Sequence, residues 1–178
     1  MFKDLGKRNA PTKKRVDKYL GLSIDDPNRV ITAHTDGSCR DNPGAGGWGA
    51  VLQLPDGRGK KIKGGHPATT NNRMELQAAI EVFKLLQGRG SCKVILFTDS
   101  QYVQKGMLEW VRGWKMRGWK TSGGAPVKNS DLWIELEFLS STHIVEWNWV
   151  RGHNGDYFNE MADRLAEEGA IEAGYYKD

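Results

Sequence analysis

The first half of the chain alternates apolar and polar residues with a period of two, which is the pattern of β-strands. The segment RVITAHTD places the β-branched residues Val30 and Thr32 on one side and predicts a strand that stops at Asp36 in a TDGS turn. A glycine-rich bend then leads to strands expected over residues 47–54 and 60–64, which are joined by the turn PDGRG. These three strands predict an antiparallel meander.

Beyond the meander, helical patterns alternate with strand patterns. Apolar residues at helical spacing predict a helix that ends at Gly88, and residues 93–99 (KVILFTD) are typical of a strand buried on both faces in a parallel part of a sheet. A helix is expected to begin at Ser100. The remaining pattern predicts a helix over 131–139, a half-buried strand over 143–150, and a last helix from Asp156 whose inner face is Met161, Ala162, Leu165 and Ala166. This order of elements predicts one α/β domain.

Residues 1–28 contain few apolar residues and are broken by Pro11, Gly21 and Pro27, so we expect them outside the core. A short helix from Thr12 to Gly21 is compatible with the spacing. A mitochondrial transit peptide is the rival interpretation, but the segment contains acids and has no serine before Ser23. A basic extension that adds phosphate affinity is preferred.

Charge is distributed unevenly over the 178 residues, whose formal net charge is +4. Residues 1–20 hold seven Lys or Arg against two Asp, and residues 112–128 hold five cations and no acid, so the rest of the chain is acidic. Two basic patches on an acidic body suit a polyanion held by its backbone. No apolar run approaches the length of a membrane helix, and two cysteines without CxxC spacing, Cys39 and Cys92, favour a reducing intracellular compartment.

The segment WVRGWKMRGWK interleaves aromatic residues with cations and glycines. Rings and cations in this arrangement hold nucleic-acid backbones, and we favour that role for residues 115–120. For Trp110 and Trp133, packing in the core is the favoured interpretation.

Four acids stand at positions where the chain changes direction. Taken singly, each has an ordinary explanation: Asp36 as a turn residue, Glu75 in a capping box with Asn72, Asp99 as a helix cap and Asp163 as a solvated helix residue. Taken together, strand ends and helix starts can bring these four side chains to one point. Carboxylates that meet need a counter-charge, and oxygen ligands without a Cys/His cluster favour Mg²⁺ or Mn²⁺ over Zn²⁺. Two such ions about 4 Å apart activate a water and stabilise the leaving oxygen of a phosphodiester.

Several blocks of the sequence resemble those of bacterial type 1 ribonucleases H with a basic protrusion. The blocks run in order over about residues 29–170 and read ITAHTDGSCRDNPGAGGWGAVL, TTNNRMEL, LFTDSQYV, WKMRGWKTSGGAPVKNSDLW and WVRGHNGDYFNEMAD. The resemblance implies a ribonuclease H-like fold, with a mixed five-stranded sheet of three antiparallel and then parallel strands, flanked by helices. It also implies an endonuclease that cuts the RNA strand of RNA/DNA hybrids, leaves 5′-phosphate and 3′-hydroxyl ends, and has little sequence specificity.

The resemblance further implies roles for individual residues. Two Mg²⁺ ions, with Mn²⁺ as a substitute, would be held by Asp36, Glu75, Asp99 and Asp163, and His153 would assist proton transfer or product release. Contacts to the hybrid are implied for a larger set, consisting of Cys39, Asn42, Thr70, Asn71, Asn72, Gln101, Trp114, Lys115, Arg117, Trp119, Lys120 and Asn159. Residues 171–178 are expected to form a C-terminal tail.

Two other functions remain open on the sequence. A transposase, integrase or resolvase-like nuclease of the same fold also uses sheet-borne carboxylates, whereas a hybrid-binding module without activity predicts that one of the four carboxylates is missing. None is missing. The eukaryotic relatives implied by the resemblance carry an N-terminal hybrid-binding module, but residues 1–28 contain no tryptophan. A cytoplasmic monomer with no obligate protein partner and no membrane association is expected.

Overall fold

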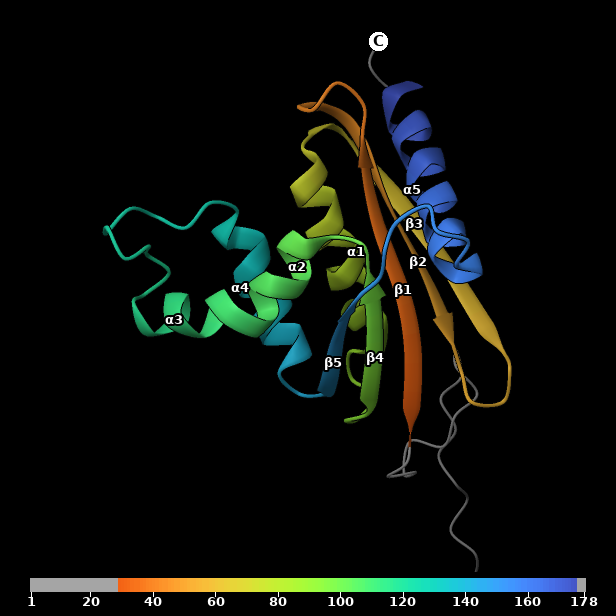
Figure 1. Ribbon diagram of the computed structural model, residues 1–178, viewed down its shortest axis with the longest axis horizontal. Helices are drawn as coiled ribbons and strands as arrows, with labels where there is room; N and C mark the ends of the chain where they lie inside the picture. Colours follow the sequence, from red (N-terminus) through yellow and green to blue (C-terminus); the bar gives the residue numbers. More distant parts are fainter. Residues whose placement is uncertain (1–28, 176–178) are drawn as a thin grey trace, which may run out of the picture.

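The structure, a computed structural model, describes residues 29–175, so the basic extension expected over residues 1–28 lies outside the described residues. The five strands form one sheet in the order β3-β2-β1-β4-β5 (Figure 1). Their bounds are Val30–Cys39 (β1), Gly44–Gln53 (β2), Gly59–Thr69 (β3), Lys93–Thr98 (β4) and Ile144–Trp149 (β5). Neighbouring strands are antiparallel across β3-β2-β1 and parallel across β1-β4-β5. The predicted mixed sheet and its meander are confirmed.

The helices cover the two faces of this sheet unequally. Their bounds are Asn71–Leu86 (α1), Gln101–Lys105 (α2), Gly106–Trp110 (the π-helical turn η1), Val111–Met116 (α3), Ser130–Ser140 (α4) and Tyr157–Tyr175 (α5). In Figure 1, α1 lies behind the sheet, α5 lies along β2 and β3, and α2, α3 and α4 gather at the β4-β5 side. Within residues 29–175, no helix combines the length and the apolar character needed to cross a bilayer.

The core lies between α1, α4 and the sheet. Phe83, Leu96, Leu136 and Trp133 have no exposed surface there. Burying side chains of this size contributes roughly 1.5–3 kcal/mol each to folding. Trp133 was expected in the core and is found there, whereas Trp110 is partly exposed and packs against the Trp114 and Tyr102 rings.

Helix α5 packs against backbone rather than against large side chains. A Cβ atom built on Gly47 would lie 2.1 Å from the Ala166 carbonyl oxygen, and one on Gly49 would lie 2.4 Å from the Ala162 oxygen. Only small residues fit on the facing side of the helix, where Ala162, Ala166, Ala170 and Ala173 are buried. The predicted inner face is therefore correct for the two alanines, whereas Met161 and Leu165 are partly exposed and Leu165 meets the sheet with its Cβ, beside Gly49.

The strand carrying Asp36 continues past it, contrary to the prediction. Asp36 pairs with Gly49 and Gly37 pairs with Trp48, because the glycine-rich segment is itself strand β2 and extends the ladder to Cys39. Strand β4 ends at Thr98, as predicted, but Ile95 and Phe97 are only half-buried because α5 packs over β1, β2 and β3. Residues 171–175, expected in a tail, continue α5.

Candidate active site

Three carboxyl side chains from different elements converge beside strand β1. Asp36 lies within β1, Glu75 in the second turn of α1, and Asp99 in the segment between β4 and α2. One carboxyl oxygen from each lies within 4.8 Å of the others. The parallel pairing of β1 with β4 places Thr35 beside Thr98, which brings the two aspartates that follow them to the same level of the sheet.

Glu75 reaches this cluster because the residue after Asp36 is a glycine. A Cβ atom on Gly37 would lie 2.3 Å from the Glu75 nitrogen and 2.5 Å from the Met74 carbonyl carbon, so any larger residue would push α1 away from β1. The Gly37 N–H also donates to Asp36 Oδ1 at 2.8 Å. Gly37, which looked like a turn glycine in the sequence, instead permits a close contact between the helix and the strand.

The ordinary explanations for Glu75 and Asp99 do not hold. The N-cap of α1 is Thr70, whose Oγ1 accepts from the Arg73 N–H at 3.4 Å, so Glu75 takes no part in a capping box with Asn72. The N-cap of α2 is Ser100, whose Oγ accepts from the Val103 N–H at 3.2 Å. Both carboxyl groups are therefore left for another use.

Asp163 and His153 border the cluster on the α5 side. Burial and the charge of Asp99 raise the pKa of Asp36 most, and the charge of Asp163 raises it further, which places the fourth predicted acid near the first. His153, in the loop between β5 and α5, is 80% exposed, and its Nδ1 lies 3.8 Å from Asp163 Oδ2. The start of α5 is fixed by Asp156, whose Oδ1 accepts from the N–H groups of Phe158 and Asn159 at 3.1 and 2.9 Å.

The electrostatics of the cluster indicate a cation site. Burial and the neighbouring charges of Asp99 and Asp163 raise the pKa of Asp36 to about 8. Burial, with the charge of Asp36 second, raises the pKa of Glu75 well above its usual value, and burial with the charge of Asp163 also raises the pKa of Asp99. Glu75 Oε2 is buried and has no hydrogen-bond partner among residues 29–175. A bound cation would offset both the burial of these carboxylates and the repulsion between them.

The donor set fits a hard divalent metal ion. Asp36, Glu75 and Asp99 offer oxygen atoms only, and Asp163 adds another at the edge. Such ligands suit Mg²⁺ or Mn²⁺ in preference to softer ions. These four residues are the ones that could hold the metal.

Several of the residues expected to contact a hybrid gather next to this cluster. Asn42 lies in the turn between β1 and β2, and its Oδ1 accepts from the Asn71 N–H at 3.1 Å. Cys39 lies at the end of β1 with its Sγ 3.5 Å from the Thr69 carbonyl oxygen. Thr70, Asn71 and Asn72 form the start of α1, and Gln101 is the exposed first residue of α2. The structure therefore places these residues at the starts of α1 and α2 and at the β1–β2 turn.

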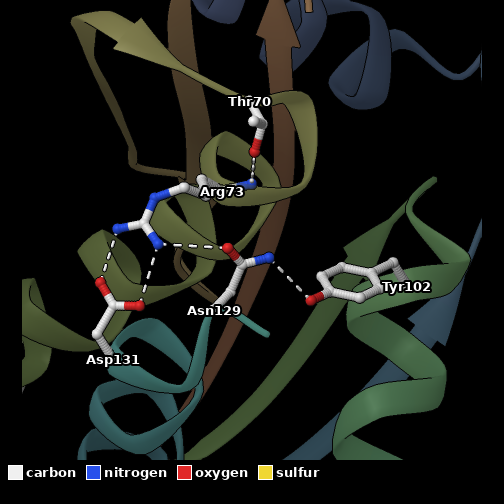
Figure 2. Close-up of polar contacts among 5 residues, drawn as sticks. All are labelled: Thr70, Arg73, Tyr102, Asn129 and Asp131. Atoms are coloured by element: carbon white, nitrogen blue, oxygen red, sulfur yellow. Dashed lines mark hydrogen bonds and ion pairs between the residues drawn. The ribbon is translucent and has the colours of Figure 1, made fainter. Parts of the chain in front are cut away.

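A hydrogen-bond network that the sequence did not indicate joins these helix starts. Figure 2 shows the Arg73 guanidinium between Asp131, which it meets at 3.0 and 2.7 Å, and Asn129 Oδ1 at 3.3 Å. The Asn129 amide in turn donates to the Tyr102 hydroxyl at 3.1 Å. Asn129 has a left-handed φ of 58°. Asn129 directly precedes α4, and Asp131 lies in its first turn, so this run resembles an ordinary helix start in the sequence.

The predicted protrusion contributes less exposed aromatic surface than expected. Trp114 and Trp119 are half-buried against the core, and the Trp114 ring meets Trp133 edge-on at 5.5 Å. Lys115, Arg117 and Lys120 are all exposed, and Lys115 also pairs with Glu137 at 2.6 Å. The exposed surface of this segment therefore consists mainly of cations and of the outer edges of the rings.

Asn159, another residue expected to contact the hybrid, is buried in the structure. It is 2% exposed in the first turn of α5, because its backbone is tied to the Asp156 cap. Its buried Oδ1 has no hydrogen-bond partner within the described part of the chain. A contact of this side chain with the hybrid therefore stays a prediction.

Comparisons with known proteins agree with this geometry. The sequence model of the RNase H family matches residues 28–171. Ribonuclease HI of Caulobacter vibrioides is 56% identical over 143 residues, which make up 80% of this chain and 94% of that protein. The ribonuclease H of Herminiimonas arsenicoxydans is 57% identical over 139 residues, which make up 78% of this chain and 93% of that protein.

Solved structures give the same result. The crystal structure of LC9-RNase H1, described as a type 1 RNase H with the type 2 active-site motif, matches with a TM-score of 0.75 at 37% identity and covers 84% of this chain and 75% of its own. The structural match to LC9-RNase H1 and the sequence matches to the bacterial relatives lead to the same assignment. The chain belongs to the ribonuclease H family.

Proposed function

We propose that this protein cuts the RNA strand of RNA/DNA hybrids with two Mg²⁺ ions bound at its acidic cluster, giving 5′-phosphate and 3′-hydroxyl ends with little sequence preference. As a ribonuclease H it is an enzyme and a nuclease. The observation that supports the proposal most directly is the meeting of Asp36, Glu75 and Asp99 within 4.8 Å, with their pKa values raised and no basic side chain hydrogen-bonded to any of them among the described residues.

The side chains of the cluster have distinct tasks in this proposal. Asp36, Glu75, Asp99 and Asp163 hold the metal ions, with Asp36 between the other three. When bound, Mg²⁺ supplies positive charge next to the scissile phosphate and lowers the pKa of a coordinated water. His153 is exposed beside Asp163 and is placed to carry a proton between the site and solvent.

Recognition of the hybrid follows from the surfaces around the cluster. The asparagines at the start of α1, with Asn42 and Gln101, present amides that can bond to 2′-hydroxyl groups in the minor groove of the hybrid. Thr70 and the segment from Trp114 to Lys120 hold the DNA strand through its phosphates. Because these contacts address sugars and phosphates, they distinguish RNA from DNA but carry little base information.

A cleavage assay with matched substrates tests the proposal. A fluorescent RNA/DNA hybrid should be cut in Mg²⁺ and spared in EDTA, while single-stranded RNA and duplex DNA of the same sequence survive. Equal cutting of duplex DNA would favour a transposase-like or resolvase-like nuclease instead. Binding of the hybrid without any cleavage in Mg²⁺ or Mn²⁺ would leave only a binding module.

Replacing His153 with alanine should slow turnover without abolishing it. The imidazole touches the cluster only at its edge, 3.8 Å from Asp163, so its loss removes proton transfer but not the metal ligands. We expect kcat to fall on the order of 100-fold, with KM nearly unchanged, in steady-state assays on the hybrid. Asn154→Ala, in the same exposed loop, is the control. A kcat equal to that of the wild type would remove His153 from the mechanism.

We also propose that residues 1–28 act as a basic arm that adds phosphate contacts. The support is their charge, with seven cations against two acids in residues 1–20. Deleting residues 1–20 should weaken hybrid binding and flatten the dependence of log Kd on log salt concentration, since each lost phosphate contact lowers the slope by about 0.9. An unchanged salt slope would show that the arm does not touch nucleic acid. The unpaired thiols of Cys39 and Cys92 support a cytoplasmic location, and a monomer is proposed.

A further inference from the structure

In the loop between β5 and α5, the consecutive residues Gly152 and His153 lie next to two of the four carboxylates, those of Asp99 and Asp163. His153 faces Asp163, as described above. Gly152 faces Asp99: a Cβ atom built on Gly152 would lie 2.5 Å from Asp99 Oδ2, 3.4 Å from its Cγ and 3.5 Å from its Cβ. The space that a side chain at position 152 would occupy is therefore already taken by the Asp99 carboxylate.

The loop cannot easily move away from Asp99, because both of its ends are tied down. At its start, the Val150 N–H donates to the Thr98 carbonyl oxygen at 2.9 Å, and the Trp149 indole N–H donates to the Asp99 carbonyl oxygen at 2.8 Å. At its end, Asp156 caps α5. The first two bonds fix the start of the loop to Thr98 and to Asp99, the residue that carries the carboxylate.

Gly152 is required for space and not for an unusual backbone conformation. Its neighbours His153 and Gly155 have left-handed φ values of 52° and 80°, but Gly152 is not among the residues with positive φ. An alanine can adopt the Gly152 backbone without strain. Its methyl group would then meet the end of the Asp99 side chain, which can rotate, whereas the backbone of β4 and β5 would stay in place.

We propose that Gly152 is a positioning residue, whose missing side chain lets the Asp99 carboxylate occupy its place in the acidic cluster. The proposal rests on the metal-binding role proposed for Asp99. In this proposal Gly152 affects catalysis only through the position of Asp99. Gly37, Gly47 and Gly49, in contrast, permit the packing of helices on the sheet.

The test compares Gly152→Ala with the wild type in the full-length protein. We expect kcat on a hybrid to fall on the order of 10- to 100-fold, the usual effect of displacing a reacting group by about 1 Å, while KM changes less than about twofold. The melting temperature in EDTA should stay within about 3 °C of the wild type, and its rise on adding Mg²⁺ should be reduced. Gly174→Ala is the matched control, because a Cβ there would meet only Ala45 Cβ, at 3.6 Å.

Two further variants separate the possible failures. Asp99→Asn alone should lose turnover; if it does not, the proposed site is wrong, whatever Gly152 does. If Asp99→Asn is inactive, the positioning role would be overturned by a Gly152→Ala variant whose kcat, and whose rise in melting temperature on adding Mg²⁺, equal those of the wild type. A fall in melting temperature in EDTA well beyond 3 °C would also overturn it, since it would assign Gly152 to the fold. Adding Gly152→Ala to Asp99→Asn should leave the Mg²⁺ response of the single variant unchanged.

Discussion

Replacing Asp36 with asparagine should abolish turnover of an RNA/DNA hybrid, with a loss in kcat on the order of a thousandfold or more. Asp36 lies within 4.8 Å of Glu75 and Asp99, measured between carboxyl oxygens, and the charge of Asp163 also acts on it. Asparagine keeps the shape and one oxygen but removes the negative charge, so metal binding is weakened where all four side chains meet. Steady-state cleavage in Mg²⁺ measures the loss, and Asp99→Asn should behave in the same way.

Binding of the hybrid should survive the same substitution. The surfaces proposed to hold the nucleic acid lie at the helix starts and on the protrusion, so the dissociation constant measured by fluorescence anisotropy should stay within about twofold of the wild type. Asp56→Asn is the control for turnover, since Asp56 lies in the exposed hairpin between β2 and β3 and pairs with Arg58. Full activity in Asp36→Asn would exclude Asp36 as a ligand.

The metal-free protein should lose stability as the pH rises from 5 to 8. The pKa of Asp36 is raised to about 8 in the folded state, and those of Glu75 and Asp99 are also raised, whereas in the unfolded chain these groups ionise near pH 4. The folded state therefore holds protons that the unfolded state has already released. The stabilisation is fully present below pH 4 and is lost as the pH approaches 8. We expect the free energy of unfolding in EDTA to fall by about 2–4 kcal/mol between pH 5 and pH 8.

Denaturant titrations at several pH values check this slope. Asp36→Asn should flatten it and raise the stability at pH 8 in EDTA, and Mg²⁺ should do the same for the wild type by neutralising the ionised cluster. Glu168→Gln is the control: Lys63 lowers the pKa of this exposed carboxylate, so its titration lies below the range tested. Burial lowers the pKa values of His34 and His143, which adds a slope of the opposite sign over this range, so the comparison with Asp36→Asn is decisive. A slope in Asp36→Asn equal to that of the wild type would contradict the raised pKa of Asp36.

The sequence predicted the sheet and the convergence of the acids because both follow from regular patterns. Period-two segments gave the meander, helical spacing gave α1 up to the residues before Gly88, and the continuous apolar run gave β4. The carboxylates were recognised as a set once their positions at strand and helix boundaries were compared. Local patterns were sufficient for these features because hydrophobic periodicity reports which face of an element is buried.

The remaining features depend on contacts between distant segments, which periodicity does not report. Thr70 caps α1, not Asn72 as the capping-box interpretation required. Gly37 was read as a turn glycine, although its role depends on how closely α1 approaches β1. The contact of the Trp114 ring with Trp133 from α4 could not be predicted from the run of cations and aromatic residues around Trp114. In each of these cases a tertiary contact decides between two roles that are locally acceptable.

The contact of α5 with the glycines of β2 has a consequence for how the active site tolerates sequence change. The helix rests closely on main-chain atoms of the glycines through its alanines, Gly169 and the Cβ of Leu165, so little adaptable side chain is present to absorb a change in thickness. Asp163 follows Ala162 immediately, and a larger residue at 162 or 166 would act as a wedge that tilts the helix and carries the carboxylate with it. On the outer side of α5, Glu168 and Glu172 only pair with Lys63 at the surface, whereas on the inner side an added methyl group is expected to move Asp163, one corner of the proposed metal site.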